Sequence, residues 1–464
     1  MDNKKVHELV DANFDDMLKD LSDLIRVPSV LDESARTEEH PFGPRVTEAL
    51  DKFLATAAGL GFRTANIDNM AGYAELGDGP LFGVLAHLDV MPSGSAANWH
   101  FPPFDATAAN GRLYGRGTSD DKGPAVSALY AIKALGDSGA RLARRFRVIV
   151  GLDEESGFRC IERYKKTEEI PEMSFSPDAD FPVVNAEKGI LRFVLRKSMS
   201  NMDAMGIPEL VDIRGGDRFN IVPDELAIFF RGAAAANLET LLMPHGAEIA
   251  NTGNGTLVTF RGKSAHAMAP QEGDNAIQKF LGAVEELDFG PPALHVALLE
   301  LWSLFGRETD GASLGIAASD EVSGRLSCNL AAISFDDGAL SVKCDVRYPV
   351  TCDGDAIIEN IKKSAARVNW TLDAPKHSRP LYVPPDTRLV KTLLEAYEAV
   401  TGEHGAPVSI GGGTYCKALP NAVSFGAMFP GEEETAHQPD EYIGLDSLRK
   451  MTHIYAEALC MFNK

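Results

Sequence analysis

Three short apolar runs of this chain lead into residues that can bind a metal ion. The runs and the polar residues that follow them are Leu81–Leu85 with His87 and Asp89, Val148–Leu152 with Glu154 and Glu155, and Phe175 with Asp178. Short β-branched runs of this kind indicate buried strands, and open α/β sheets build their sites at the carboxyl ends of such strands. We therefore expect an α/β fold whose sheet edge gathers imidazole and carboxylate groups, a set that suits a divalent cation such as zinc.

The remaining pattern divides the chain into two domains. A length of 464 residues exceeds one ordinary hydrophobic core. Apolar residues at helical spacing over 5–26 and 45–60, followed by alternating strands and helices to about residue 190, predict an α/β sheet. Alternating strands with fewer helices then predict an α+β insert over 190–378. The first domain is therefore expected to be discontinuous, with parts 1–189 and 379–464.

Charge and cysteine usage exclude some classes of protein. The 45 Lys and Arg against 67 Asp and Glu give a net charge of −22, which disfavours binding to nucleic acid or to an anionic membrane. No stretch approaches the roughly 20 apolar residues of a membrane span, and the first residues contain no apolar signal segment. The 6 cysteines form no C-x-x-C pair, which is typical of a reducing compartment. We expect a cytoplasmic protein without nucleic-acid or membrane partners.

Three motifs together carry a family resemblance. They are His87-Leu-Asp89, the segment Gly-Arg-Gly-Thr-Ser-Asp-Asp-Lys-Gly over 115–123, and Asp-Glu-Glu-Ser-Gly over 153–157. In combination they resemble the M20 family of metallopeptidases, and within it the PepV-like dipeptidases, over nearly the whole chain. The resemblance implies a zinc-peptidase-like catalytic domain, 1–189 and 379–464, with 190–378 as an inserted lid domain.

The same resemblance implies a centre of two divalent cations. His87 and Asp178 would bind one cation, Glu155 and His437 the other, and Asp120 would bridge both. A cis peptide bond is implied between Asp120 and Asp121. Zinc is the first expectation, although manganese and cobalt accept the same imidazole and carboxylate set.

Each of these residues has a commoner structural reading when taken alone. A single histidine such as His87 is usually a satisfied core residue, Asp120 could be a helix N-cap, and Glu154-Glu155 could be a solvated charge pair. Their combination in family order favours the metal site. On a strand, Asp89 would share a face with His87, where its carboxylate could accept the second imidazole N–H.

The resemblance also assigns catalytic and substrate-binding residues. Glu154 would be the general base that takes a proton from a metal-activated water and delivers it to the leaving amine. His266, in Gly-Lys-Ser-Ala-His-Ala-Met-Ala-Pro, would stabilise the oxyanion. Asn220 would lie beside the substrate, and Arg347 would bind its C-terminal carboxylate through the guanidinium fork.

A glycine-rich loop over 411–417 departs from the family pattern. Gly413 and Thr414 are expected to bind substrate, because bare backbone N–H groups can hold a carboxylate. PepV-like sequences usually continue as Tyr-Ala-Arg, whereas this chain has Cys416 and Lys417 after its tyrosine. Lysine keeps the charge but lacks the planar fork, which changes how a carboxylate would be recognised.

These expectations describe a monomeric dipeptidase that hydrolyses unblocked dipeptides. The monomer follows from the insert, which is long enough to cover the site without a second subunit. The alternatives are another M20 amidohydrolase, namely an N-acyl-amino-acid deacylase, a succinyl-diaminopimelate desuccinylase or an aminopeptidase, and a non-catalytic binding protein that keeps the fold. Since every ligand position and Glu154 are filled by suitable residues, the sequence favours an enzyme.

Overall fold

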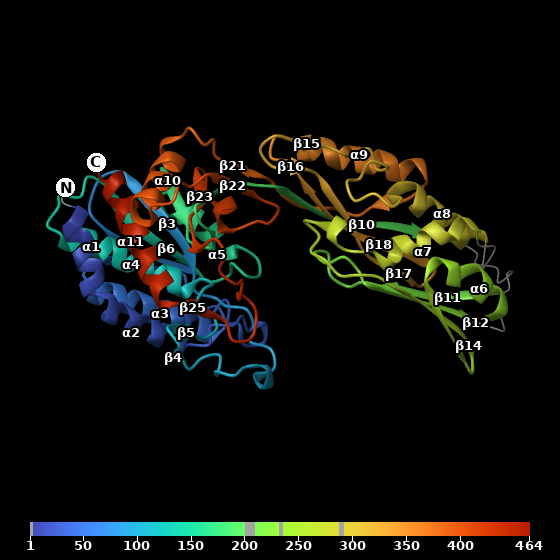
Figure 1. Cartoon of the computed structure of the whole chain (residues 1–464), viewed down its shortest axis with the longest axis horizontal. Helices are drawn as coiled ribbons and strands as arrows, with labels where there is room; N and C mark the ends of the chain where they lie inside the picture. Colours follow the sequence, from blue (N-terminus) through green and yellow to red (C-terminus); the bar gives the residue numbers. More distant parts are fainter. Residues whose placement is uncertain (1–2, 200–208, 232–234, 287–291) are drawn as a thin grey trace. The chain divides into compact units, whose positions relative to one another are not determined.

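The computed structural model describes residues 3–199, 209–231, 235–286 and 292–464, which form two compact units (Figure 1). Unit 1 comprises Met1–Ala186, Tyr382–Ser409 and Thr414–Lys464, and unit 2 comprises Glu187–Leu381 and Ile410–Gly413. Unit 2 therefore interrupts unit 1, and the expected insert 190–378 lies inside it. The segment Ile410–Gly413 was expected in the second part of the catalytic domain but belongs to unit 2.

Unit 1 is built on a mixed sheet with the strand order β1-β2-β6-β3-β7-β23-β9-β21, and β22 also pairs with β9. The strands are β1 (Arg63–Ile67), β2 (Ala71–Leu76), β3 (Leu81–His87), β6 (Arg145–Gly151), β7 (Met173–Ser176), β9 (Val183–Glu187), β21 (Leu381–Tyr382), β22 (Pro407–Ile410) and β23 (Ala422–Ser424). At its centre β3 runs parallel to both β6 and β7, and β23 runs parallel to β7. The carboxyl ends of these strands therefore meet at one edge of the sheet.

Helices cover the unit 1 sheet and bury its central strands. Every residue of β3 is buried, and so is most of α4, which is apolar along most of its length. The helices are α1 (Asn3–Ala12), α2 (Phe14–Ile25), α3 (Pro44–Gly59), α4 (Lys122–Asp137), α5 (Arg159–Thr167), α10 (Arg388–Thr401) and α11 (Leu445–Phe462). Helix α4 contacts β3, β6 and α11, so the apolar helix that begins beside Asp121 is anchored on the central strands.

The single helix predicted over 5–26 is wrong in one respect. The structure has two helices, α1 and α2, separated at Asn13. Asparagine is a weak helix former because its side chain competes for backbone hydrogen bonds. The apolar periodicity continues across the break, since Val10 and Phe14 are both buried, and for this reason periodicity alone did not reveal it.

Unit 2 combines an antiparallel sheet with helices. Its strand order is β13-β14-β12-β11-β17-β18-β10-β19, with β20 beside β10. The strands are β10 (Gly189–Ser198), β11 (Glu209–Gly215), β12 (Glu225–Arg231), β13 (Ala247–Thr252), β14 (Gly255–Arg261), β17 (Ser327–Asp336), β18 (Ala339–Tyr348), β19 (Thr371–Leu372) and β20 (Lys376–Ser378), and the helices are α6 (Ala235–Leu242), α7 (Ala276–Ala283), α8 (Pro292–Phe305) and α9 (Gly354–Arg367). Side chains such as Phe260 and Phe280, with ring centroids 5.7 Å apart, join the sheet to α7 in a separate apolar core.

The smaller elements lie in the connections. They are β4 (Thr107–Ala109), β5 (Arg112–Tyr114), β8 (Ala179–Asp180), β15 (Ser319–Asp320), β16 (Gly324–Arg325), β24 (Ala427–Met428) and β25 (Tyr442–Gly444). Among the helices of the described segments, none combines the length and the apolar character that crossing a lipid bilayer requires.

Candidate metal centre

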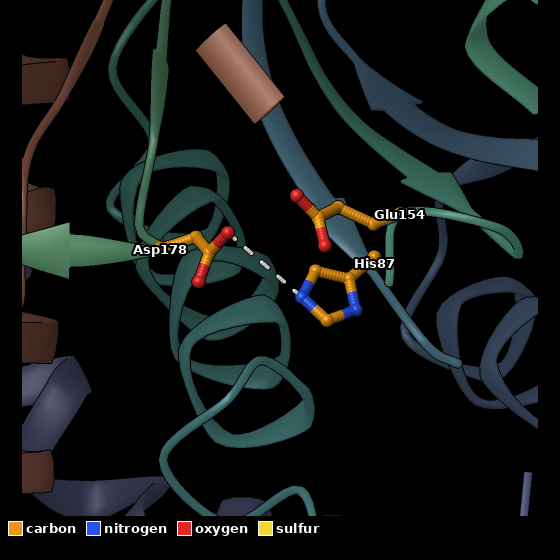
Figure 2. Close-up of side chains that lie close together, drawn as sticks. All are labelled: His87, Glu154 and Asp178. Carbon is orange, nitrogen blue, oxygen red and sulfur yellow. Dashed lines mark ion pairs between the residues drawn. The ribbon is translucent and has the colours of Figure 1, made fainter. Parts of the chain in front are cut away.

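The parallel strands of unit 1 bring the predicted polar residues to one place. His87 is the last residue of β3 and lies opposite Gly151, the last residue of β6. Glu154 and Glu155 follow β6 within a few residues, and Asp178 follows β7. Figure 2 shows the side chains of His87, Glu154 and Asp178 facing a common space. Their convergence follows directly from the strand order β6-β3-β7.

Two groups of side chains form the centre. Ligand atoms of His87, Glu154 and Asp178 lie within 4.8 Å of one another, and so do those of Asp120, Glu155 and His437. The Asp178 carboxylate is 3.9 Å from Nε2 of His87 (Figure 2). The peptide bond between Asp120 and Asp121 is cis, as the resemblance implied.

Asp120 lies between the two groups. One of its carboxylate oxygens, Oδ1, is 2.9 Å from Nε2 of His87, and the other, Oδ2, is 2.9 Å from Nε2 of His437. His437 Nε2 is also 2.9 Å from Oε1 of Glu155. A carboxylate with each oxygen directed at a different imidazole has the arrangement that a bridging ligand between two cations requires.

The donor atoms fit a divalent cation. Nε2 of His87 and Oδ1 of Asp120 are buried, and neither has a hydrogen-bond partner within the described parts of the chain, although they lie close together. Burying such atoms without a partner is costly. Imidazole nitrogen with several carboxylate oxygens is a set that zinc, manganese and cobalt accept. A cation at this place would therefore satisfy atoms that the chain itself leaves unsatisfied.

Asp89 supports the centre differently from the prediction. Nδ1 of His87 donates to the backbone carbonyl of Asp89 at 2.9 Å, whereas the Asp89 carboxylate is 3.6 Å from that nitrogen. The carboxylate instead accepts the backbone N–H groups of Glu154 and Glu155, at 3.2 and 3.1 Å. The prediction assumed strand alternation, but β3 ends at His87. With the proton on Nδ1, Nε2 presents its lone pair to the centre.

Burial and charge shift the pKa values of these groups. Burial, followed by the neighbouring carboxylates, raises the pKa of Glu154 to about 8. Hydrogen bonds to Asp120 and Glu155 raise the pKa of His437 to about 10. Burial opposes ionisation of Asp120, but the adjacent His437 and His87 imidazoles outweigh it and lower the pKa of that carboxyl group. The lowered pKa of Asp120 and the raised pKa of His437 both mean that this place favours positive charge, as a cation site does.

The predicted catalytic residue His266 and three predicted substrate-binding residues, Asn220, Arg347 and Gly413, lie in unit 2. His266 forms an isolated β-bridge with Ile221, and the N–H of Ala267 donates to the carbonyl of Asn220 at 2.9 Å. The loop that carries His266 and the segment that carries Asn220 are therefore neighbours. Partial burial of the His266 imidazole, followed by the Arg347 cation, lowers the pKa of that group.

Arg347 is buried and held by its own neighbours. Its Nε and Nη2 donate to the Asp345 carboxylate at 2.5 and 3.1 Å, and Nη1 donates to the carbonyl of Gly411 at 3.1 Å. The bidentate face of the guanidinium is thus occupied by Asp345, and a substrate carboxylate could use only the outer N–H groups. Gly413 is exposed at the end of the Ile410–Gly413 segment of unit 2.

Thr414 belongs to unit 1 and is buried there. Its Oγ1 lies 3.0 Å from the hydroxyl of Ser424 and accepts the N–H of Cys416 at 3.2 Å. The Cys416 thiol is buried 3.3 Å from the same serine hydroxyl. The hydroxyl of Thr414 is therefore engaged in local structure, and substrate binding through the backbone N–H groups of this loop stays a prediction.

Two supporting carboxylates were missed as individual residues. Asp121 accepts the backbone N–H of His87 at 3.1 Å. Asp153 is fully buried and accepts from Nε and Nη2 of Arg159, each at 2.7 Å. Each lies next in sequence to a predicted site residue, and this adjacency was the available signal. The sequence does not show which N–H groups each carboxylate accepts.

Known proteins match this chain over most of its length. The model of "Peptidase family M20/M25/M40" matches residues 83–460. "Putative dipeptidase YtjP" of Bacillus subtilis is 38% identical over 96% of this chain and 96% of its own length. "Putative dipeptidase SH1171" of Staphylococcus haemolyticus is 34% identical over the same shares, 96% and 96%.

Solved structures share the fold at low sequence identity. Human carnosine dipeptidase 1 is 15% identical with a TM-score of 0.61, covering 99% of this chain and 98% of that one. Aminoacylhistidine dipeptidase from Vibrio alginolyticus is 14% identical with a TM-score of 0.59, covering 96% of each chain. At such identities the likeness concerns the fold.

Proposed function

The chain belongs to peptidase family M20/M25/M40 and is a metallopeptidase, and from this premise we propose that it is a dipeptidase acting on unblocked dipeptides. The observation that carries the proposal is the Asp120 carboxylate, whose two oxygens each lie 2.9 Å from a different histidine ring nitrogen. Two relatives that match the chain over nearly its full length are named as dipeptidases, which supports the substrate class.

We propose two divalent cations, zinc first and manganese or cobalt as alternatives. His87 and Asp178 would hold one, Glu155 and His437 the other, and Asp120 would bridge them. When bound, the cations supply Lewis-acid polarisation of the substrate carbonyl and acidify an attacking water.

Glu154 is the proposed general base. It lies in the same group as His87 and Asp178 but is the neighbour of Glu155 in sequence, and burial gives it a pKa of about 8, close to neutrality. In its ionised form Glu154 would take a proton from the attacking water, and because burial favours the protonated carboxyl group, it would hold that proton until it is delivered to the leaving amine. Asp89 fixes the backbone at Glu154 and Glu155 and so orients this carboxylate.

The roles proposed for residues of unit 2 rest on the family resemblance. His266, whose lowered pKa keeps the imidazole neutral, would donate a hydrogen bond to the developing oxyanion. Arg347 would bind the C-terminal carboxylate of the dipeptide, with Asn220 and Gly413 nearby in the same role. We further propose a monomer in a reducing, cytoplasmic environment, which agrees with cysteines that form no disulfide bond within the described residues.

The test is hydrolysis of a dipeptide panel by metal-stripped protein, before and after Zn²⁺, Mn²⁺ or Co²⁺ is added. Tripeptides and N-acetyl amino acids are assayed alongside. We expect cleavage that depends on the added cation and is confined to free dipeptides. Cleavage of the acylated amino acids instead would assign the chain to a deacylase, and no cleavage of any substrate would support the binding-protein alternative.

A further inference from the structure

We propose that Glu441, together with Arg116, is a positioning residue that fixes the loops of Asp120 and His437 relative to each other. This inference deepens the proposed function, on which its catalytic meaning rests, but it concerns cation binding and can be tested without a substrate. Neither residue belongs to a group of metal-ligand side chains.

Glu441 stands where the two loops meet. It follows His437 by a few residues and directly precedes β25, which pairs with β5 in antiparallel register, Tyr442 opposite Tyr114. Strand β5 leads into the loop 115–121 that carries Asp120. The backbone carbonyl of Glu441 accepts the N–H of Gly115 at 2.9 Å, so the strand pairing continues into the start of that loop.

The Glu441 carboxylate is fully buried and receives donors from the same loop. Oε1 accepts the backbone N–H groups of Gly117 at 2.9 Å and Ser119 at 3.1 Å, and the Ser119 hydroxyl at 3.1 Å. The N–H of Asp120 itself points to the same oxygen at 3.4 Å. A single carboxylate oxygen therefore organises the backbone immediately before the proposed bridging ligand.

The other carboxylate oxygen is paired with a buried cation. Oε2 accepts from Nη1 of Arg116 at 2.6 Å, and the Arg116 side chain is nearly inaccessible to solvent. Nε of Arg116 has no hydrogen-bond partner within the described segments, and the guanidinium lies 5.3 Å from the Trp99 ring. Removing the charge of Glu441 would leave a buried guanidinium without its counter-ion, which is strongly unfavourable.

Only a negatively charged side chain as long as that of glutamate can accept the loop N–H groups and pair with Arg116 at the same time. Glutamine keeps the shape but offers one acceptor oxygen in place of two, and its NH₂ group would face either Arg116 or the backbone donors. The loop would then shift, and because His437 and Asp120 approach within 2.9 Å, a small shift separates them. The cation held by Asp120, Glu155 and His437 should be weakened more than the one held by His87 and Asp178.

The experiment compares Glu441→Gln with Glu75→Gln in the full chain. Glu75 is a matched control, because it is also buried and its Oε2 accepts two hydrogen bonds from buried Arg147, at 2.9 Å from Nε and 2.6 Å from Nη2. Binding of Zn²⁺ is measured by calorimetry, the Co²⁺ centre by its visible spectrum, and folding by thermal unfolding. We expect both variants to unfold at lower temperature, whereas only Glu441→Gln weakens the second cation, by roughly 10- to 100-fold, and alters the Co²⁺ spectrum.

Wild-type binding of both cations by Glu441→Gln, or an equal loss in Glu75→Gln, would overturn the proposal. If Glu441→Gln does not fold, Ser119→Ala and Glu441→Asp decide. Ser119→Ala removes one donor but keeps the ion pair, and should weaken the second cation slightly, whereas Glu441→Asp keeps the charge but retracts it and should weaken that cation more. Normal cation binding in both would overturn the proposal. A wild-type chain that binds two cations but cleaves no dipeptide would contradict the proposed function and leave this inference intact.

Discussion

Nδ1 of His87 donates its hydrogen bond to the backbone carbonyl of Asp89, 2.9 Å away, and the Asp89 carboxylate is left to receive the backbone N–H groups of Glu154 and Glu155. The tautomer of His87 therefore does not depend on the charge of Asp89. Backbone geometry at the proposed base does depend on that charge.

Asp89→Asn is expected to lower kcat by roughly 10- to 100-fold while His87 keeps its affinity for a cation. The amide would face one of the two N–H groups with its own NH₂, which displaces Glu154 or Glu155. Measurements of kcat and of Co²⁺ affinity, with His87→Ala as the reference for lost binding, check this. Equal loss of cation affinity in the two variants would mean that the carboxylate acts through His87.

Glu154→Gln is expected to reduce turnover by roughly 100- to 10,000-fold, the range for removing a general base. Glutamine has a similar shape but cannot take the proton. Cation content, measured after dialysis against Zn²⁺, should stay near the wild-type value. Near-normal hydrolysis by this variant would show that another group is the base.

Cation binding to the stripped protein is expected to release protons. The pKa of His437 is raised to about 10 by hydrogen bonds to Asp120 and Glu155, so the imidazole is protonated near neutral pH. A cation needs the free nitrogen, and its affinity should therefore rise with pH until His437 loses its proton. Calorimetric titration with Zn²⁺ in two buffers of different ionisation enthalpy measures the release, and His437→Gln should release fewer protons.

Arg347→Lys is expected to raise KM for dipeptides by about 10-fold or more with a smaller change in kcat, the loss of a charged hydrogen bond. Asp345 occupies Nε and Nη2 of Arg347, and one ammonium group cannot serve both Asp345 and a substrate carboxylate. Arg192→Lys is the control, because Arg192 also donates to Asp345, at 2.9 Å. A similar KM increase in both variants would attribute the effect to Asp345 alone.

Acid is expected to loosen α1 from α11. Burial lowers the pKa of His453. Its hydrogen bond to Asp11 opposes this shift, whereas the charges of His7 and Arg449 lower the pKa further. A lowered pKa in the fold means that the unfolded chain binds the proton better, so this stability is complete above about pH 6.5 and is lost as pH falls through the folded pKa. The hydrogen bond from His7 lowers the pKa of Glu457, so the unfolded chain binds this proton better as well. Stability is therefore also lost when Glu457 is protonated, at a lower pH than His453.

Thermal unfolding of the wild type and of His453→Gln over this pH range tests the expectation. The variant should show a flatter dependence between neutral pH and about pH 5. His404→Gln is a matched control, since His404 is an exposed histidine 3.1 Å from Glu398. A slope in His453→Gln that equals the wild-type slope would contradict the assignment.

The convergence of the proposed ligands could be predicted from the sequence because it depends on parallel strands. His87, Glu155 and Asp178 each follow an apolar run, and parallel neighbours deliver their carboxyl ends to one edge whatever the order of the strands. The sequence pattern did not predict the order of the strands in the sheet, because that order depends on packing between distant segments. The insert was visible because alternating strands replaced the earlier mixture.

Other features had no sequence signal. The apolar helix α8 (Pro292–Phe305) was not predicted, since it is apolar on nearly all sides and lacks a polar face. The expected hydrogen bond from His87 to the Asp89 carboxylate is not formed, because β3 ends at His87, two residues before Asp89, and strand alternation does not apply there. Glu441 receives backbone N–H groups from a loop more than 300 residues away in sequence, and such donors leave no trace in residue types.

The position of β23 between β7 and β9 has a consequence for synthesis of the chain. During translation the first 186 residues of unit 1 are made before β23 (Ala422–Ser424), which lies between two of their strands, and His437 is made later still. Unit 2, whose strands and helices come from one almost continuous stretch, can fold meanwhile. The proposed cation site would thus be completed late in synthesis, and a chain that ended before His437 would lack one of its proposed ligands.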